Sequence, residues 1–521
     1  MTDIIIYNLV FLLFIIYFSK KTRNGIHMLQ LESYKNERYG KWIKNNKNKV
    51  WNKKEILFIF PIILYILRKN LYANILLILI TFILISTYKN EKQKKPLVVT
   101  SRVKRMYATY ICLIALLFII LNVSNNKINI LLFNIFITII SYYLVIAINI
   151  VNSPIEKNIQ KKFYNNAKKK IKDMPNLRVI GITGSFGKTS TKYILSNILM
   201  QKYDVLMTPA SYNTTLGVVR TINENMKPTN QVFVCEMGAK NIGDIKEICD
   251  LVNPEYGIVT SIGNQHLETF KTLDNIKKTK MELIDSLPSE GLGFLNYDDE
   301  NIVTCKTDKN IVKFGLNSDN EFWAEDITIN EKGSNFTICS KDGKKIEVKT
   351  KLLGEHNILN IVGATAIAYK MGLNDNEIKL GIKTLKPVPH RLEMKTLPNG
   401  NVIIDDAYNS NVKGAKMALD VLKLFNDRKK ILVTPGIVDL GDSAYECNKN
   451  LGKQATESAD FIILVGEKAA KPIYDGIKET NYNLENVYIA KDLEDALSKM
   501  NSLMLDKSVV LLENDLPDNY L

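Results

Sequence analysis

A glycine-rich segment, TGSFGKTS at Thr183–Ser190, holds the residue types that bind a phosphate group. Gly184 and Gly187 let backbone N–H groups turn toward phosphate oxygens, Lys188 supplies a positive charge, and the Thr189 hydroxyl can hold Mg²⁺. The loop is one residue longer than the strict GxxxxGK[ST] pattern but meets the TGxxGKT[ST] form. An apolar run precedes it and an amphipathic stretch follows. This context favours a phosphate-binding loop between a strand and a helix over a structural turn.

Three further residues could complete a metal site beside this loop. Glu236 ends the apolar run VFVCE, where a carboxylate would face a nucleotide crevice and offer Mg²⁺ a hard oxygen; the alternative is a solvated glutamate. His266 follows another predicted strand and a tight turn, although a lone histidine is usually structural. Lys280, in TKMEL, has by itself the pattern of a solvated helix lysine.

The elements that would position these residues follow an α/β pattern. From Arg178 onward, short apolar runs alternate with longer amphipathic stretches, which predicts parallel strands joined by crossover helices. The segment KTLKPVPHR at Lys383–Arg391, with two prolines, interrupts this pattern and predicts a boundary before a smaller C-terminal domain. The expected strands include Val179–Thr183, Val232–Glu236, Gly257–Thr260, Val402–Asp405, Ile431–Thr434 and Phe461–Val465.

The first third of the chain has a different composition. Residues 1–180 contain 29 Lys and Arg against 7 Asp and Glu, a net charge of +22, whereas the remainder carries −7. These basic residues stand between apolar runs, which is typical of a membrane protein and speaks against a nucleic-acid partner. The six cysteines show no CxxC pair and no zinc spacing, so isolated thiols are expected. The apolar runs are Ile4–Phe18, Ile56–Leu67, Leu71–Thr87, Tyr107–Val123 and Ile128–Val151.

The basic stretches predict how these runs are oriented. Lys20–Lys54, Lys89–Arg105 and Lys157–Lys172 are rich in Lys and Arg, and the positive-inside rule places all three in the cytoplasm. About five membrane-spanning helices follow, with the N-terminus outside and everything after the fifth run inside. The second run contains Pro61 and is short enough to be interfacial or re-entrant. Because Asp3 precedes the first run and no cleavage site follows it, an anchor is favoured over a signal peptide.

Seven segments downstream of the loop carry a family resemblance. They are SYNTTLGV (Ser211–Val218), VCEMGA (Val234–Ala239), TSIGNQHLETF (Thr260–Phe270), TKMEL (Thr279–Leu283), LGEHNILNIVGA (Leu353–Ala364), PHRLE (Pro389–Glu393) and DDAYNSN (Asp405–Asn411). With the loop, they resemble in order and spacing the Mur ligases, ATP-dependent amino-acid ligases of peptidoglycan precursor synthesis, most closely the branch that adds D-alanyl-D-alanine. The resemblance covers most of residues 178–441.

The apolar runs and the resemblance together predict a domain plan. An α-helical membrane region (residues 1–154) and a basic linker (155–177) would precede an α/β part. That part would comprise a central P-loop ATPase domain (178–386) and a smaller, Rossmann-like C-terminal domain (387–521). The chain would then be a multi-pass protein of the cell membrane, with its ligase domains in the cytoplasm and membrane lipid as a partner.

The resemblance also implies roles for individual residues. Those implied to bind ATP are Gly184, Ser185, Gly187, Lys188, Thr189, Ser190, His356, Asn357, Asn360, Arg391 and Asp406. Those implied to hold magnesium are Thr189, Glu236, His266 and Lys280, the last as a carbamate formed with CO₂. Those implied to contact the acceptor are Asn213, Thr214, Tyr408, Asn409 and Asn411, and the catalytic set is Lys188, His266, Lys280 and Arg391. From the residues alone, Asn357 could instead cap a helix.

The chain departs from the family pattern in three ways. His390 stands where the family usually has glycine before the arginine, and Val412 stands where proline is common. The C-terminal sequence LLENDLPDNYL lacks the basic turn that grips the peptide carboxylate in the muramyl-peptide ligases, so the acceptor could differ. The soluble N-terminal domain that holds the substrate's uridine diphosphate is replaced by the membrane region.

The expected reaction is amide-bond formation through an acyl phosphate, with a cell-wall precursor as the carboxylate and an amino acid or dipeptide as the amine. A poly-γ-glutamate-type ligase remains an alternative. A transport or signalling ATPase is less favoured, because the apolar runs contain no charge and no LSGGQ-type segment occurs. A scaffold without activity is disfavoured by the intact loop and its companions Glu236, His266 and Lys280.

Overall fold

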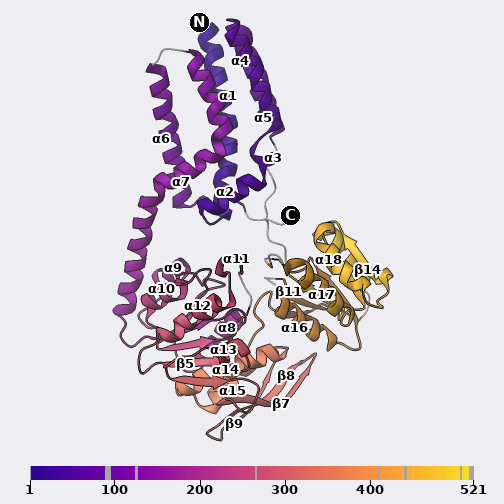
Figure 1. The fold of residues 1–521 in the computed structure, drawn as a ribbon. Coiled ribbons are helices and arrows are strands. Elements are labelled where there is room, and N and C mark those ends of the chain that lie inside the picture. The colour runs from indigo at the N-terminus through magenta and orange to yellow at the C-terminus, as the bar shows by residue number, and fades with distance from the viewer. Residues whose placement is uncertain are drawn as a thin grey trace. The chain divides into compact units, whose positions relative to one another are not determined.

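The computed structural model describes residues 2–88, 96–123, 127–263, 267–407, 411–438, 440, 443–504 and 507–514. The chain divides into two compact units, Met1–Lys161 and Lys162–Leu521 (Figure 1). The first is helical and the second is α/β.

The helical unit is built from long helices joined by short ones. Its elements are α1 (Thr2–Leu31), α2 (Asn36–Asn45), α3 (Lys47–Val50), the 3₁₀ helix η1 (Lys53–Phe58), α4 (Ile59–Ile66), α5 (Asn70–Thr87), α6 (Ser101–Val123) and the first part of α7 (Lys127–Lys172). One apolar core joins α1, η1, α4, α5 and α7, and a second joins α1, α2, α6 and α7. The stretch expected as a linker is largely the end of α7, which continues past Pro154 into the second unit.

Two described stretches in this unit are long and apolar enough to cross a membrane, Asn70–Thr87 and Ile135–Lys172. They contain the third expected run, Leu71–Thr87, and most of the fifth, Ile128–Val151. The second run is divided between η1 and the eight-residue α4, so it is too short for a regular span. The first and fourth runs lie in α1 and α6, which do not meet the same test over their described residues. Of about five expected spans, two are therefore supported.

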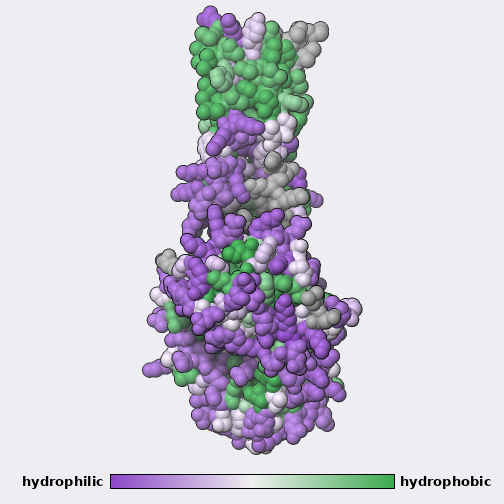
Figure 2. All heavy atoms as spheres, turned by 90° about the vertical axis from the view of Figure 1, so that its right-hand side faces the viewer, coloured by the Kyte–Doolittle hydropathy of each residue, from purple (hydrophilic) through white to green (hydrophobic). Residues whose placement is uncertain are grey.

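Apolar side chains cover much of the surface of the helical unit. Figure 2 shows them gathered in a band over one part of it, separated from the hydrophilic surface of the rest. Leu12, Phe60, Leu79 and Ile119 are each more than half exposed. An exposed apolar surface of this extent is rare on a water-soluble monomer and marks a surface that meets lipid or another protein.

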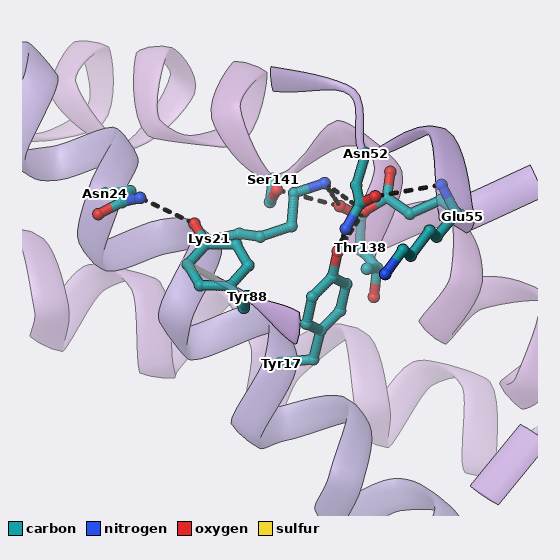
Figure 3. A network of polar contacts seen from close by, with 9 residues as sticks. Tyr17, Lys21, Asn24, Asn52, Glu55, Tyr88, Thr138 and Ser141 are labelled. Carbon is teal, nitrogen blue, oxygen red and sulfur yellow. Dashed lines mark hydrogen bonds and ion pairs between the residues drawn. The ribbon is translucent and has the colours of Figure 1, made fainter. Parts of the chain in front are cut away.

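A buried ion pair joins three helices inside this unit (Figure 3). Lys21 Nζ donates to Glu55 Oε1 at 2.7 Å and to the Thr138 carbonyl at 2.9 Å, while Tyr17 Oη donates to the same carboxylate oxygen at 2.9 Å. The side chains of Lys21 and Glu55 are 2% and 6% exposed. Because these residues belong to α1, η1 and α7, the pair fixes η1 against the two long helices α1 and α7.

Replacing Glu55 with alanine should strongly destabilise the helical unit. Glu55→Ala leaves the Lys21 ammonium buried without its counter-ion, which typically costs about 3–5 kcal/mol. The measurement is the thermal midpoint of the purified full chain in detergent. The double variant Lys21→Met with Glu55→Leu removes both charges and should retain more stability than Glu55→Ala. An equal loss in both variants would show that packing, and not the charge, dominates.

The α/β unit contains a nine-stranded sheet with the order β2-β3-β1-β4-β5-β6-β7-β8-β9. The strands from β2 to β7 are parallel to their neighbours, and β7, β8 and β9 form an antiparallel extension that the sequence pattern did not predict. The strands are β1 (Arg178–Thr183), β2 (Val205–Met207), β3 (Val232–Glu236), β4 (Tyr256–Val259), β5 (Leu292–Asn296), β6 (Ile311–Phe314), β7 (Phe322–Asn330), β8 (Gly333–Ser340) and β9 (Lys345–Thr350).

Helices cover both faces of this sheet. They are α8 (Lys188–Leu199), α9 (Thr215–Asn225), α10 (Asp244–Val252), α11 (Leu267–Phe270), α12 (Leu273–Asp285), α13 (Glu300–Val303), α14 (Glu355–Lys370) and α15 (Asp375–Lys383). One core contains residues of α8, α14 and α15, and the other contains residues of α9, α10 and α12. The last turns of α7 join the second core through Ala167 and Ile171, and Lys170 Nζ donates to the Asn223 carbonyl at 2.8 Å at the end of α9.

A separate six-stranded sheet follows, with the order β10-β11-β15-β12-β13-β14 and only β10 antiparallel. Its strands are β10 (Glu393–Thr396), β11 (Val402–Asp406), β12 (Lys429–Thr434), β13 (Phe461–Val465), β14 (Val487–Ala490) and β15 (Ser508–Glu513). Its helices are α16 (Val412–Lys423), α17 (Ala444–Thr456), α18 (Glu467–Lys478), α19 (Leu493–Leu503) and the 3₁₀ helix η3 (Leu484–Asn486). All six strands expected from the sequence are present within one or two residues.

Candidate phosphate- and metal-binding site

The glycine-rich loop joins the end of β1 to the start of α8, as predicted. A Cβ on Gly184 would lie 2.1 Å from Thr260 Oγ1, and one on Gly187, whose φ is 80°, would lie 2.9 Å from Asn360 Oδ1. Only glycine therefore fits at either position. The segment after β4 also orders the loop backbone, because Phe186 N donates to Ser261 Oγ at 2.8 Å. The loop is thus held by the segment after β4 and by α14.

Lys188 lies at the first position of α8 and points back over the loop. Its Nζ donates to the carbonyls of Gly184 at 2.6 Å and Ser185 at 3.1 Å. Desolvation lowers the pKa of Lys188 to about 8, with Glu236 opposing the shift and the positive charge of Arg391 adding to it. An anion bound in the loop would favour the charged form of this lysine. Ser185 Oγ donates a hydrogen bond to the Gly263 carbonyl at 3.0 Å. Ser190 lies in the first turn of α8.

Glu236 is the centre of a buried polar cluster at the end of β3. Its Oε1 accepts hydrogen bonds from Thr189 Oγ1 at 3.2 Å and Asn213 Nδ2 at 3.1 Å, and its Oε2 accepts one from Lys192 Nζ at 3.1 Å. The Glu236 side chain is 1% exposed. The alternative of a solvated glutamate is therefore wrong.

The donor atoms in this cluster fit a magnesium ion. A hydroxyl and a carboxylate oxygen lie 3.2 Å apart beside the phosphate loop, and both are the hard oxygen donors that Mg²⁺ takes alongside substrate phosphates. Thr189 and Glu236 are the residues that would hold it. His266, the third expected ligand, lies outside the described residues.

Lys280 is buried on α12, with 3% of its surface exposed. Burial lowers its pKa well below the ordinary value, and the positive charge of Lys188 lowers that pKa further. The negative charges of Glu282 and Asp244 oppose this lowering but are smaller causes. The interpretation as a solvated helix lysine is wrong, because α12 turns this position toward the sheet.

The start of α14 lies against the phosphate loop. Asn360 Oδ1 accepts a hydrogen bond from Thr191 Oγ1 of α8 at 3.1 Å and lies beside Gly187. His356 is in the first turn, where desolvation lowers its pKa to about 4, so the ring is neutral at physiological pH. Asn357 does not cap the helix: Gly354 occupies that position, and Asn357 Nδ2 donates to the Leu353 carbonyl at 2.8 Å.

Arg391 and Asp406 lie in the C-terminal domain, which belongs to the same α/β unit as the phosphate loop. Arg391 contributes to the electrostatics of both Lys188 and Lys192. Desolvation and the neighbouring Glu513 raise the pKa of Asp406 to about 7, and its Oδ1 accepts a hydrogen bond from Leu392 N at 3.1 Å. Arg391 therefore adds positive charge to the phosphate site from outside the central domain.

The departure at His390 has a backbone explanation. His390 has φ 59°, the left-handed region in which glycine is favoured, which accounts for the usual glycine there. Its Nδ1 lies 2.9 Å from Asp405 Oδ2. Glu393 completes a group of possible metal ligands with them, but Lys395 Nζ already pairs with both carboxylates at 3.0 and 3.3 Å. His390, Glu393, Asp405 and Lys395 therefore form an ion-pair cluster, which explains their closeness without a metal ion.

The residues predicted to contact the acceptor substrate have different hydrogen-bond partners in the structure. Asn213 contacts Glu236, whereas Thr214 and Asn411 use their side-chain oxygens to cap α9 and α16. Tyr408 and Asn409 lie outside the described residues.

Two residues that contact the phosphate loop or Glu236 were not predicted from the sequence. Lys192 contacts Glu236 directly, and the one available signal was its position four residues after Lys188, on the same face of α8. Ser261, in the quoted TSIGNQHLETF segment, orders the loop backbone, and nothing in its residue type indicates that role.

Comparison with known protein families gives two matches. The Mur ligase middle domain matches residues 182–368, and the Mur ligase, glutamate ligase domain matches residues 390–513. The first range contains the phosphate loop, Glu236 and Lys280, and the second contains Arg391 and Asp406. The helical unit lies outside both.

Individual relatives agree with these matches. The UDP-N-acetylmuramoyl-tripeptide–D-alanyl-D-alanine ligase of Escherichia coli (strain K12) is 31% identical over 297 residues, which are 56% of this chain and 65% of that protein. The chain spans less than two thirds of the length of the first curated relatives it matches.

Solved structures show the same fold. MurF from Acinetobacter baumannii is 26% identical with a TM-score of 0.62, over 68% of this chain and 77% of that one. The MurF ligase from Thermotoga maritima in complex with ADP is 25% identical with a TM-score of 0.61, over 68% of this chain and 80% of that one. These likenesses confirm the fold expected for the α/β part.

Proposed function

Because the chain belongs to the Mur ligase family, we propose that it is an ATP-dependent ligase that joins an amino acid or dipeptide to a cell-wall precursor through an amide bond. The observation that carries the proposal is the pairing of the phosphate loop with Glu236, whose carboxylate lies 3.2 Å from the Thr189 hydroxyl. The similarity to UDP-N-acetylmuramoyl-tripeptide–D-alanyl-D-alanine ligases favours that dipeptide as the amine.

In the proposed reaction, a carboxylate oxygen of the acceptor attacks the γ-phosphorus of ATP and ADP leaves. The nitrogen of the incoming amine then attacks the carbonyl carbon of the acyl phosphate, and phosphate leaves with the loss of a proton. Lys188 and Arg391 would neutralise the charge that develops on the transferred group, which is catalysis by positioning and electrostatics. Mg²⁺ held by Thr189 and Glu236 would supply further positive charge.

The ligase activity can be tested directly with the full chain in detergent. ATP, Mg²⁺ and D-alanyl-D-alanine are supplied with either a nucleotide-linked or a lipid-linked muramyl tripeptide, and the product is identified by mass spectrometry. We expect one amide product for each ADP formed. Lys188→Ala should lower turnover at least about 100-fold, since a preorganised charge on the transferred phosphate is lost. Full turnover in a folded Lys188→Ala variant, or no amide product from either acceptor with D-alanyl-D-alanine or single amino acids, would contradict the proposal.

A carbamate on Lys280 is part of the proposal. A buried amine whose pKa is lowered by desolvation more than Glu282 and Asp244 raise it is disposed to lose its proton, and the neutral amine adds CO₂ to give a carbamate and a proton. The carbamate would place a carboxylate near Lys188, whose positive charge lowers the pKa of Lys280, and would add an oxygen ligand for magnesium.

Lys280→Ala should therefore lose about 100-fold or more in turnover, because a metal-directed carboxylate is gone. Acetate or formate should partly restore the alanine variant by entering the vacated space. Lys280→Arg is the matched control, since its bulk and permanent charge fill that space and should prevent rescue. Full activity of Lys280→Ala at low CO₂ without added acid would remove the carbamate from the mechanism.

We also propose that the helical unit lies in the cell membrane as a multi-pass anchor, with the ligase domains in the cytoplasm. The two candidate spans and the exposed apolar band support this placement. The basic stretches between the apolar runs favour an N-terminus outside and ligase domains inside, whether Ile56–Thr87 crosses the membrane twice or forms a re-entrant hairpin. The acceptor would then be met at the inner face of the membrane.

The topology can be tested with single cysteines in a variant without native cysteines. A membrane-impermeant maleimide applied to intact cells should label Asn125→Cys but not Asn48→Cys or Ser289→Cys. All three should react after the cells are opened. Labelling of Ser289→Cys in intact cells would overturn the cytoplasmic placement.

A further inference from the structure

Lys192 is a fully buried cation in the α/β unit. Its side chain is 0% exposed, and its Nζ donates to Glu236 Oε2 at 3.1 Å and also to the Ala210 carbonyl. It lies one helical turn after Lys188 on α8. The ammonium therefore joins the helix that follows the phosphate loop to two other segments, the end of β3 and the loop after β2.

The carbonyl that Lys192 contacts belongs to an unusual residue. Ala210 has φ 43°, a left-handed conformation that is unfavourable for a residue other than glycine. Such conformations persist where the surroundings hold them in place and concentrate at functional sites. Three residues later, Asn213 donates to Glu236 Oε1, and its carbonyl accepts from Gly238 N at 2.6 Å. Lys192 and Asn213 thus attach the same loop to the same carboxylate.

The two oxygens of Glu236 have different partners. Oε1 faces Thr189 and Asn213, and Oε2 faces Lys192. Without the ammonium, the carboxylate could turn its plane about the Cγ–Cδ bond and carry its oxygen away from Thr189. With the ammonium in place, only Oε1 lies beside the hydroxyl that would share a metal ion.

We propose that Lys192 is a positioning residue that fixes Glu236 for metal binding and, through the Ala210 carbonyl, fixes the loop at residues 208–214 for acceptor binding. The inference rests on the proposed function. Lys192 itself does not contact the reacting atoms, because its ammonium is occupied by Glu236 and Ala210. It differs in this from Lys188, whose Nζ contacts only carbonyls of the phosphate loop.

The test compares Lys192→Met and Lys192→Gln with the wild-type full chain. Metal affinity is measured by electron paramagnetic resonance of Mn²⁺ in the presence of ADP, and ADP affinity is measured separately in EDTA. We expect Mn²⁺ binding to weaken about 10–100-fold, the usual effect of losing the partner of a metal ligand. The KM for the acceptor should rise, while ADP affinity without metal stays within about threefold.

Two control variants separate this role from others. Lys188→Met should lower ADP affinity in EDTA, because its charge acts on phosphate and not on Glu236. Lys202→Met replaces an exposed lysine that contacts the Gly372 carbonyl, just beyond α8, and should change neither affinity. Circular dichroism and the thermal midpoint report folding. Lys192→Gln retains a donor to Glu236 and is the variant to use if Lys192→Met does not fold.

Each outcome decides the assignment. Unchanged Mn²⁺ affinity and acceptor KM in a folded variant would overturn it, as would loss of folding in both variants, which would make Lys192 purely structural. Tighter Mn²⁺ binding would show that Lys192 competes with the metal, which also overturns it. A wild-type chain that binds no Mn²⁺ with ADP would instead contradict the proposed function, so the two failures are distinguishable.

Discussion

The buried carboxylate of Glu236 is the constraint on which the nucleotide site depends. A buried negative charge is tolerated only when donors and positive charge surround it, and here Thr189, Lys192 and Asn213 provide them. These partners come from the phosphate-loop helix and from the loop after β2. Satisfying one carboxylate therefore aligns the element that would bind phosphate with the element that would meet the acceptor.

The sheet order makes this convergence possible. β3, β1 and β4 are adjacent and parallel, so their carboxyl ends lie at one edge of the sheet. β1 leads into the phosphate loop, β3 ends at Glu236, and β4 leads into the segment that orders the loop backbone. Ligands of parallel α/β sheets bind at this edge, where helix N-termini and strand ends meet. The neighbouring C-terminal domain adds Arg391, so the positive charge of the site comes from two domains.

The helical unit obeys a different physical constraint. Many of its outer side chains are apolar, and the charged pair Lys21–Glu55 is buried inside it. α7 continues from this unit into the core of the α/β unit, where Lys170 reaches the end of α9. α9 begins directly after Thr214, so the last turns of α7, within the α/β unit, support the helix that follows the predicted acceptor loop.

The sequence by itself determined the α/β class, the six expected strands, the phosphate loop and the place of Glu236, because each depends on local periodicity or on the spacing within one segment. It also determined the apolar runs, although their lengths did not decide how many are regular spans: the second run is divided between η1 and α4 by packing. Only the tertiary structure decided which lysines are buried. Lys280 and Lys192 have the residue type of a solvated helix face, and their environments are set by what packs over them from distant segments. The same is true of Asn357, Thr214 and Asn411, whose side chains could equally bind a ligand or the backbone, and whose hydrogen bonds depend on where each helix begins.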